Sequence, residues 1–186
     1  EGGAVITRDK KIYESMVRKR ILGIDKDTWS RYKNERSWSY DVIEQGYRYH
    51  MNNINAAIGL VQMKKFEQLN KRKIDIAKRY DEEFAHIEGL SLLRTGYEDI
   101  GLFTYIIKVK NRRDEFMAHL KENGIGSGIH YIPVHHFTYY KNFLRNPLPV
   151  TDKVYEQILT LPLYPDITDE ETGLVIKGIH SFFSKS

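Results

Sequence analysis

Residues 46–62 read Gly46-Tyr47-Arg48-Tyr49-His50-Met51-Asn52-Asn53-Ile54-Asn55-Ala56-Ala57-Ile58-Gly59-Leu60-Val61-Gln62. The first half is rich in aromatic and cationic side chains, and the second half is small and apolar at helical spacing. The stretch therefore predicts a polar loop that leads into a helix. Free backbone N–H groups and the helix dipole favour negative charge at such a start. Because Arg48 and His50 add donors there, we predict a phosphate-binding site.

From Asn53 to Ile87, apolar residues recur mostly at steps of three, four and seven, which predicts one amphipathic helix or two helices nearly end to end. A continuous helix would be on the order of 50 Å long, so we expect it to connect two domains. Its lysines and arginines alternate with acidic residues. This mixture favours a solvated face, with a nucleic-acid-binding face as the alternative.

The remaining segments predict a mixture of helices and strands. A short strand is expected at residues 4–7 and a helix at residues 9–22. After the long helix we expect strands at 90–94, 103–109 and 125–132 and helices at 113–123, 151–161 and from 168 onward. The last helix begins with a capping box, Thr168-Asp169-Glu170-Glu171. The fold class predicted for the part after residue 89 is α+β, with helices on a small antiparallel sheet.

The composition limits the possible classes of protein. The 186 residues are 41% hydrophobic and 29% charged, with a net charge of +4, as in ordinary globular proteins. There is no cysteine, which excludes disulfides and thiolate metal sites. No apolar run approaches the roughly 20 residues that span a bilayer. We expect a cytoplasmic protein that binds neither membrane nor nucleic acid. The abrupt start at Glu1 suggests a piece of a longer chain.

Three of the seven histidines lie in the segment His130-Tyr131-Ile132-Pro133-Val134-His135-His136. The segment contains no cysteine and no acidic residue, so no metal site is expected there. Two interpretations remain open: a rigid segment that presents imidazoles and a phenol to a polar ligand, or structural histidines at the end of a strand. The nearby Gly124-Ile125-Gly126-Ser127-Gly128 follows a helix and precedes a strand, which favours a turn over a phosphate loop.

Four segments, in this order, resemble the DegT-type sugar-nucleotide aminotransferases, which are pyridoxal-phosphate enzymes with the aspartate-aminotransferase fold. They are residues 1–7, residues 46–62, the segment from His130 to His135, and Leu161-Pro162-Leu163-Tyr164-Pro165 with its capping box. The resemblance implies an α/β fold in which residues 1–62 complete a large cofactor-binding domain. Residues 63–186 would form the small C-terminal domain.

The resemblance also implies a function and a site. The parent enzyme would pass an amino group from glutamate to a keto-sugar nucleotide during amino-sugar biosynthesis, for example for a surface polysaccharide. It would act as a homodimer whose active sites are shared across the interface. Arg48 and His50 would bind pyridoxal 5'-phosphate, although both depart from the commoner family residues. His130, Tyr131 and His135 would lie near the substrate.

The Schiff-base lysine is expected upstream of Glu1, so no residue of this chain is assigned a catalytic role, and the 186 residues alone are predicted to be inactive. The alternatives are a non-catalytic regulatory or ligand-binding protein of the same fold and a dehydratase-like variant. Trp29 and Trp38 are candidates for stacking on a nucleotide base.

Overall fold

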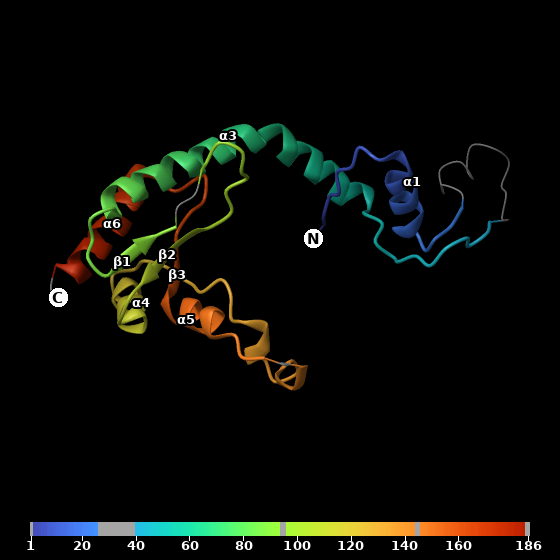
Figure 1. Cartoon of the computed structure of the whole chain (residues 1–186). Helices are drawn as coiled ribbons and strands as arrows, with labels where there is room; N and C mark the ends of the chain where they lie inside the picture. Colours follow the sequence, from blue (N-terminus) through green and yellow to red (C-terminus); the bar gives the residue numbers. More distant parts are fainter. Residues whose placement is uncertain (1, 26–39, 94–95, 144–145, 185–186) are drawn as a thin grey trace. The chain divides into compact units, whose positions relative to one another are not determined.

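The computed structural model describes residues 2–25, 40–93, 96–143 and 146–184 of the chain (Figure 1). The chain divides into two compact units, Glu1–Lys65 and Phe66–Ser186, which are described separately below. The predicted base-stacking residues Trp29 and Trp38 lie outside the described residues.

In the first unit, α1 spans Lys10–Lys19. It begins where the sequence predicts, because the Asp9 carboxylate accepts hydrogen bonds from the backbone N–H groups of Lys11 (2.7 Å) and Ile12 (3.2 Å), as an N-cap does. The predicted strand at residues 4–7 is wrong. Residues 2–7 have no regular structure, and Val5 and Ile6 are exposed, since none of the described residues pairs with their backbone.

The helix α3 spans Asn53–Phe84 without a break, which confirms the continuous version of the predicted long helix. At 1.5 Å per residue, its 32 residues extend about 48 Å. The two halves differ in burial. Ile54 and Ile58 in the first half are 75% and 57% exposed, whereas Tyr80 and Phe84 in the second half are buried. The amphipathic pattern therefore predicts the covered face correctly only in the second half of the helix.

The second unit contains a three-stranded antiparallel sheet in the order β1-β2-β3, which confirms the predicted fold class. β1 spans Leu90–Leu92, β2 spans Tyr105–Val109 and β3 spans Ile158–Leu161. In the register, Leu92 lies opposite Ile107, and Ile107 lies opposite Leu159.

The identity of the third strand corrects the sequence prediction. Residues 125–132 form no strand and contribute a single bridge, Gly128 to Thr160. The predicted helix at 151–161 ends early, so α5 spans Pro149–Gln157 and the chain then turns extended into β3. β3 has apolar and β-branched side chains that pair with β2, whereas the glycines of residues 124–128 weaken strand pairing.

Two more helices complete the unit: α4 spans Arg113–Glu122 and α6 spans Asp169–Phe183. Along β2, Tyr105, Ile107 and Val109 are buried while the residues between them are half-buried, so one face of the sheet points into the core. The core joins that face to three helices. Its buried members are Ile76, Ala77, Tyr80, Phe84, Leu102, Tyr105, Ile107, Val109, Phe116, Leu120, Ile125, Leu159, Leu161, Ile167, Val175, Ile176 and Ile179.

Two predicted helix boundaries, the end of α4 and the start of α6, are found where their signals lie, whereas α1 ends at Lys19, before the predicted residue 22. Gly124 follows α4 with φ of 72°, the left-handed conformation that favours glycine. Thr168 and Glu171 form the predicted capping box of α6, because the Thr168 hydroxyl accepts from the Glu171 N–H and the Glu171 carboxylate accepts from the Thr168 N–H. These local contacts cap the start of α6, and Arg72 on α3 also binds the Asp169 carboxylate there at 2.8 Å.

Asp81 on α3 links the helix to the sheet and to a neighbouring loop. Its carboxylate accepts hydrogen bonds from the hydroxyls of Tyr97 and Tyr105, each at 2.7 Å. Burial, with the Asp81 hydrogen bonds and charge, raises the pKa of both phenols above its ordinary value. Burial also raises the pKa of Tyr80, whose hydroxyl donates to the Pro162 carbonyl (3.2 Å).

Between α4 and α5 lie two short 3-10 helices, η1 at Val134–His136 and η2 at Lys141–Phe143. None of the helices in the described ranges is long and apolar enough to cross a membrane.

Candidate functional site

Residues 47–49 run in extended form beside the end of α1. The Tyr47 N–H donates to the Lys19 carbonyl (2.6 Å), the Leu22 N–H donates to the Tyr47 carbonyl (3.0 Å), and the Tyr49 N–H donates to the Arg20 carbonyl (2.9 Å). These backbone bonds fix the position of the segment that leads into α3.

Two glycines allow the backbones to approach here. A Cβ on Gly23 would lie 1.8 Å from the Glu44 carbonyl oxygen, and a Cβ on Gly46 would lie 2.0 Å from the Gly23 nitrogen. Any larger residue at either position would force the backbone around Gly23 away from the backbone of residues 44–46. The Glu44 side chain also ties this segment to α1, because its carboxylate binds the Arg18 guanidinium at 2.6 Å. The hydrogen bond from Arg18 holds the pKa of Glu44 below its ordinary value.

The predicted cofactor residues Arg48 and His50 are exposed, and their side chains have no hydrogen bond or ion pair with the described residues. The rings of Tyr47 and Tyr49 stack at a centroid distance of 5.1 Å. Because side chains alternate along extended backbone, Arg48 points away from the side of the stacked rings. Its guanidinium is therefore available to an anionic ligand.

The start of α3 offers further donors. The Asn52 side-chain oxygen accepts from the Asn55 N–H (2.8 Å) and so caps the helix. This cap occupies one of the free N–H groups that the sequence assigned to an anion. The N–H groups of Asn53 and Ile54 have no acceptor among the described residues, so they remain available to a ligand.

In the second unit, His130 and Tyr131 differ in their surroundings. His130 is half-buried, and its Nδ1 lies 2.9 Å from the Thr160 hydroxyl on β3. Tyr131 is 68% exposed, and its ring meets the His130 ring edge-on at 4.8 Å. The contact with Thr160 fixes the imidazole, and the phenol is left facing outward.

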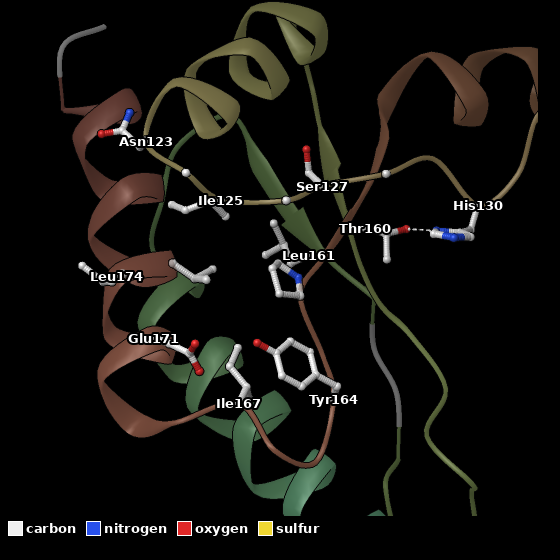
Figure 2. A pocket seen from close by; sticks show the side chains of 15 residues that line it. Asn123, Ile125, Ser127, His130, Thr160, Leu161, Tyr164, Ile167, Glu171 and Leu174 are labelled. Atoms are coloured by element: carbon white, nitrogen blue, oxygen red, sulfur yellow. Dashed lines mark hydrogen bonds between the residues drawn. The ribbon is translucent and has the colours of Figure 1, made fainter.

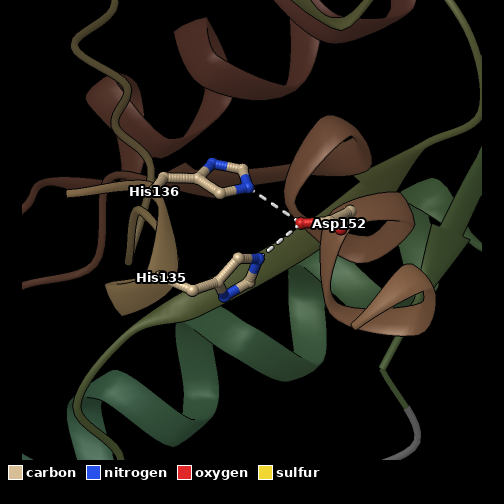
Figure 3. Close-up of side chains that lie close together, drawn as sticks. All are labelled: His135, His136 and Asp152. Atoms are coloured by element: carbon tan, nitrogen blue, oxygen red, sulfur yellow. Dashed lines mark hydrogen bonds and ion pairs between the residues drawn. The ribbon is translucent and has the colours of Figure 1, made fainter. Parts of the chain in front are cut away.

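His135 has different partners from His130. Its Nε2 lies 2.8 Å from Oδ1 of Asp152, and Nε2 of His136 lies 2.8 Å from the same oxygen (Figure 3). We call His135, His136 and Asp152 the histidine–aspartate cluster. The two imidazole hydrogen bonds hold the pKa of Asp152 below its ordinary value. The sequence missed Asp152, since this acid lies 17 residues after His135 on another helix, and it predicts no metal site at the histidine segment because the segment itself contains no acidic residue.

A pocket of about 620 Å³ lies between the glycine-rich turn, the end of β3 and α6 (Figure 2). Figure 2 shows His130 at one end, and Tyr164 and Glu171 toward the other. Of the five predicted site residues, only His130 lines this pocket. The pocket also includes residues from the turn that the sequence interpreted as purely structural. Its lining residues are Asn123, Gly124, Ile125, Gly126, Ser127, Gly128, His130, Thr160, Leu161, Pro162, Tyr164, Ile167, Glu171, Leu174 and Val175.

Comparison with known proteins places the chain in a family. Residues 1–180 match the model of the DegT/DnrJ/EryC1/StrS aminotransferase family. The chain belongs to this family. Among curated members, the chain is 36% identical over an alignment of 195 positions to the Uncharacterized protein MJ1066 of Methanocaldococcus jannaschii, and the match covers all of this chain and 50% of that protein.

Solved structures agree with membership of the DegT/DnrJ/EryC1/StrS family. The sugar aminotransferase CalS13 from Micromonospora echinospora is 28% identical with a TM-score of 0.80, over 93% of this chain and 45% of that chain. Spr1654 from Streptococcus pneumoniae, in its PLP-form, is 28% identical with a TM-score of 0.80, over 96% of this chain and 45% of that chain. The chain thus spans about half the length of the relatives it matches.

Proposed function

We propose that this chain is the carboxyl-terminal half of a pyridoxal-phosphate-dependent aminotransferase that passes an amino group from glutamate to a keto-sugar nucleotide. One observation carries the proposal: the match to the aminotransferase family runs over residues 1–180, and a solved sugar aminotransferase superimposes on 93% of the chain. An ordered match over nearly the whole chain is more informative than any single motif.

The residues present fit the phosphate of the cofactor. Arg48 supplies a planar, permanently charged guanidinium, and His50 supplies an imidazole two residues further on. Both are exposed and lack partners among the described residues, and the N–H groups of Asn53 and Ile54 at the start of α3 add neutral donors. Guanidinium and helix-start N–H groups are the donors that phosphate groups prefer in proteins.

When bound, pyridoxal phosphate supplies an electron sink for the transfer of the amino group. The proposed role of the residues in this chain is to bind the cofactor phosphate and to orient the cofactor. Arg48 and His50 would hold the phosphate, while the backbone hydrogen bonds of residues 47–49 fix the main chain that carries Arg48. We also propose that the lysine to which the cofactor is attached lies outside residues 1–186.

On the substrate side, we propose that His130 and Tyr131 contact the sugar nucleotide. The Thr160 hydroxyl orients the His130 ring, and the Tyr131 phenol is free to donate to a sugar or phosphate oxygen. His135 is a weaker candidate for substrate contact, because its Nε2 is already directed to Asp152. Of the three residues that the sequence assigned to the substrate, His130 and Tyr131 therefore remain the main proposed contacts.

We propose that the intact protein is a cytoplasmic homodimer with active sites shared between subunits, in which residues 1–62 belong to the large domain and residues 63–186 form the small one. The exposed apolar residues in the first half of α3, such as Ile54 and Ile58, support burial against protein outside this chain.

The test is an amino-transfer assay with the natural full-length protein. Pyridoxal phosphate, glutamate and a panel of keto-sugar nucleotides are supplied, and 2-oxoglutarate and the aminated nucleotide are measured. We expect both products in equal amounts from the full-length protein and none from residues 1–186 alone. A full-length protein that binds the cofactor but forms neither product with any member of the panel would overturn the proposal in favour of a binding protein.

A further inference from the structure

The histidine–aspartate cluster brings three potential metal ligands together in the second unit. Three potential ligand atoms, Nε2 of His135, Nε2 of His136 and a carboxylate oxygen of Asp152, all lie within 4.8 Å of one another. We propose that these three side chains bind a divalent first-row transition metal ion such as Zn²⁺. The site goes beyond the amino-transfer function and uses no residue of the proposed cofactor site.

The geometry supports convergence on one ion. Each histidine Nε2 lies 2.8 Å from Asp152 Oδ1. With metal–ligand bonds of about 2.1 Å, this separation corresponds to an angle near 85° at the ion for each histidine–aspartate pair, close to the angle between neighbouring ligands of an octahedron. The rings of His135 and His136 stand 82° apart, so their nitrogens approach from separate directions (Figure 3).

The backbone holds the ligands before any ion binds. Both histidines lie in η1, where the His136 N–H donates to the Pro133 carbonyl (2.9 Å) and Pro133 is buried. Asp152 lies in the first turn of α5, and its N–H donates to the Leu148 carbonyl (3.0 Å). The side chain of His135 is only 13% exposed, whereas those of His136 and Asp152 are 36% and 42% exposed. An ion therefore has access from the solvent.

The donor set selects the class of metal. Two imidazoles and one carboxylate suit borderline ions such as Zn²⁺, Co²⁺ and Ni²⁺, while Mg²⁺ and Ca²⁺ prefer oxygen ligands alone. Without the ion, both Nε2 atoms carry hydrogen and donate to Asp152. With the ion bound, each neutral imidazole carries its proton on Nδ1 and offers the Nε2 lone pair to the metal, so no oxidation or reduction is involved.

A bound ion would join η1 to α5 across the chain between His136 and Asp152. That cross-link would hold the segment next to Tyr131, one of the proposed substrate contacts, in a fixed conformation. We therefore assign the site a structural role, with water completing the coordination shell.

The test uses the natural full-length protein, without a histidine tag, and three variants. His136→Gln keeps an N–H donor toward Asp152 but removes a strong metal ligand, and His136 is exposed enough for the fold to tolerate the change. Asp152→Asn removes the anionic ligand at nearly constant size. His86→Ala is the matched control, because His86 is an exposed histidine outside the cluster. Zn²⁺ binding is measured by equilibrium dialysis, and Co²⁺ is added to record its visible absorption spectrum.

We expect the natural protein and His86→Ala to bind one Zn²⁺ per chain with the same affinity. His136→Gln and Asp152→Asn are expected to bind at least tenfold more weakly, and the Co²⁺ spectrum should lose its protein-bound bands in both. Absence of binding in the natural protein, or a loss of less than tenfold in His136→Gln, would overturn the proposal and leave the cluster as a pair of hydrogen bonds to Asp152.

Discussion

Replacement of Arg48 by alanine tests the proposed phosphate site most directly. The side chain is exposed and has no partner among the described residues, so its removal leaves no buried group unsatisfied. The backbone bridge between Arg48 and Ile21 does not depend on the side chain. Any loss of cofactor affinity in Arg48→Ala therefore reports a direct contact and not a change of fold.

The size of the effect follows from the kind of bond. A hydrogen bond to a charged group contributes about 1.5–3 kcal/mol, which corresponds to an increase of about 10- to 150-fold in the Kd for pyridoxal phosphate. Arg48→Lys keeps the charge but loses the bidentate geometry, so its Kd should lie between those of the natural protein and Arg48→Ala.

The assay is a titration of the full-length apoprotein with pyridoxal phosphate, followed by the absorbance of the bound cofactor. Arg20→Ala is the matched control, because Arg20 is also an exposed arginine of the first unit. We expect its Kd to equal that of the natural protein. A Kd in Arg48→Ala within twofold of the natural value, with unchanged thermal stability of the apoprotein, would refute the assignment of Arg48 to the phosphate.

Three further predictions concern the second unit. Asp81→Ala removes the acceptor of the Tyr97 and Tyr105 hydroxyls and should lower the free energy of unfolding in urea by about 2–4 kcal/mol. Thr168→Ala removes the cap of α6 and should lower it by about 1 kcal/mol. The fold raises the pKa values of the buried Tyr80 and Tyr105. The stability that these two protonated phenols contribute is therefore fully present below the pKa of tyrosine in the unfolded chain, near 10. Above that pH the free energy of unfolding should fall by about 1.4 kcal/mol per pH unit for each tyrosine.

A second variant tests each of these three predictions. Asp81→Asn, which keeps one acceptor oxygen, should lie between Asp81→Ala and the natural protein, and equal stability of all three would contradict the role of the carboxylate. Thr168→Ser should restore most of the loss in Thr168→Ala. Tyr105→Phe should make the fall in stability above pH 10 less steep, and an unchanged slope would show that this phenol does not remain protonated in the fold.

Local signals in the sequence predict much of the fold. The start of α1 at Asp9, the capping box of α6 and the left-handed glycine after α4 depend on contacts between residues two to five apart. The sequence also predicts helical structure along α3, because a repeated helical period over 32 residues is hard to satisfy by any other structure, but it leaves open whether there is one helix or two.

The candidate site is predicted less completely. Arg48 and His50 are singled out by the sequence alone, because aromatic and cationic residues directly before a helix are a local pattern, and their role in cofactor binding stays a prediction. The hydrogen-bond partners of His130 and His135 are not predicted from the sequence. His130 meets Thr160 across 30 residues, and His135 meets Asp152 across 17, so no spacing within the motif indicates either contact.

What the sequence by itself determined is the presence of the five α-helices of the described residues, the start of α1, the end of α4 and the capping box of α6, the strands β1 and β2, and the family. Only the tertiary structure decided that residues 158–161, and not 125–132, form the third strand, because both segments have extended propensity and the choice depends on pairing with Tyr105 and Ile107. It also decided that two histidines and Asp152 converge on one point. Both results depend on contacts between residues distant in the chain, and short-range patterns carry no information about such contacts.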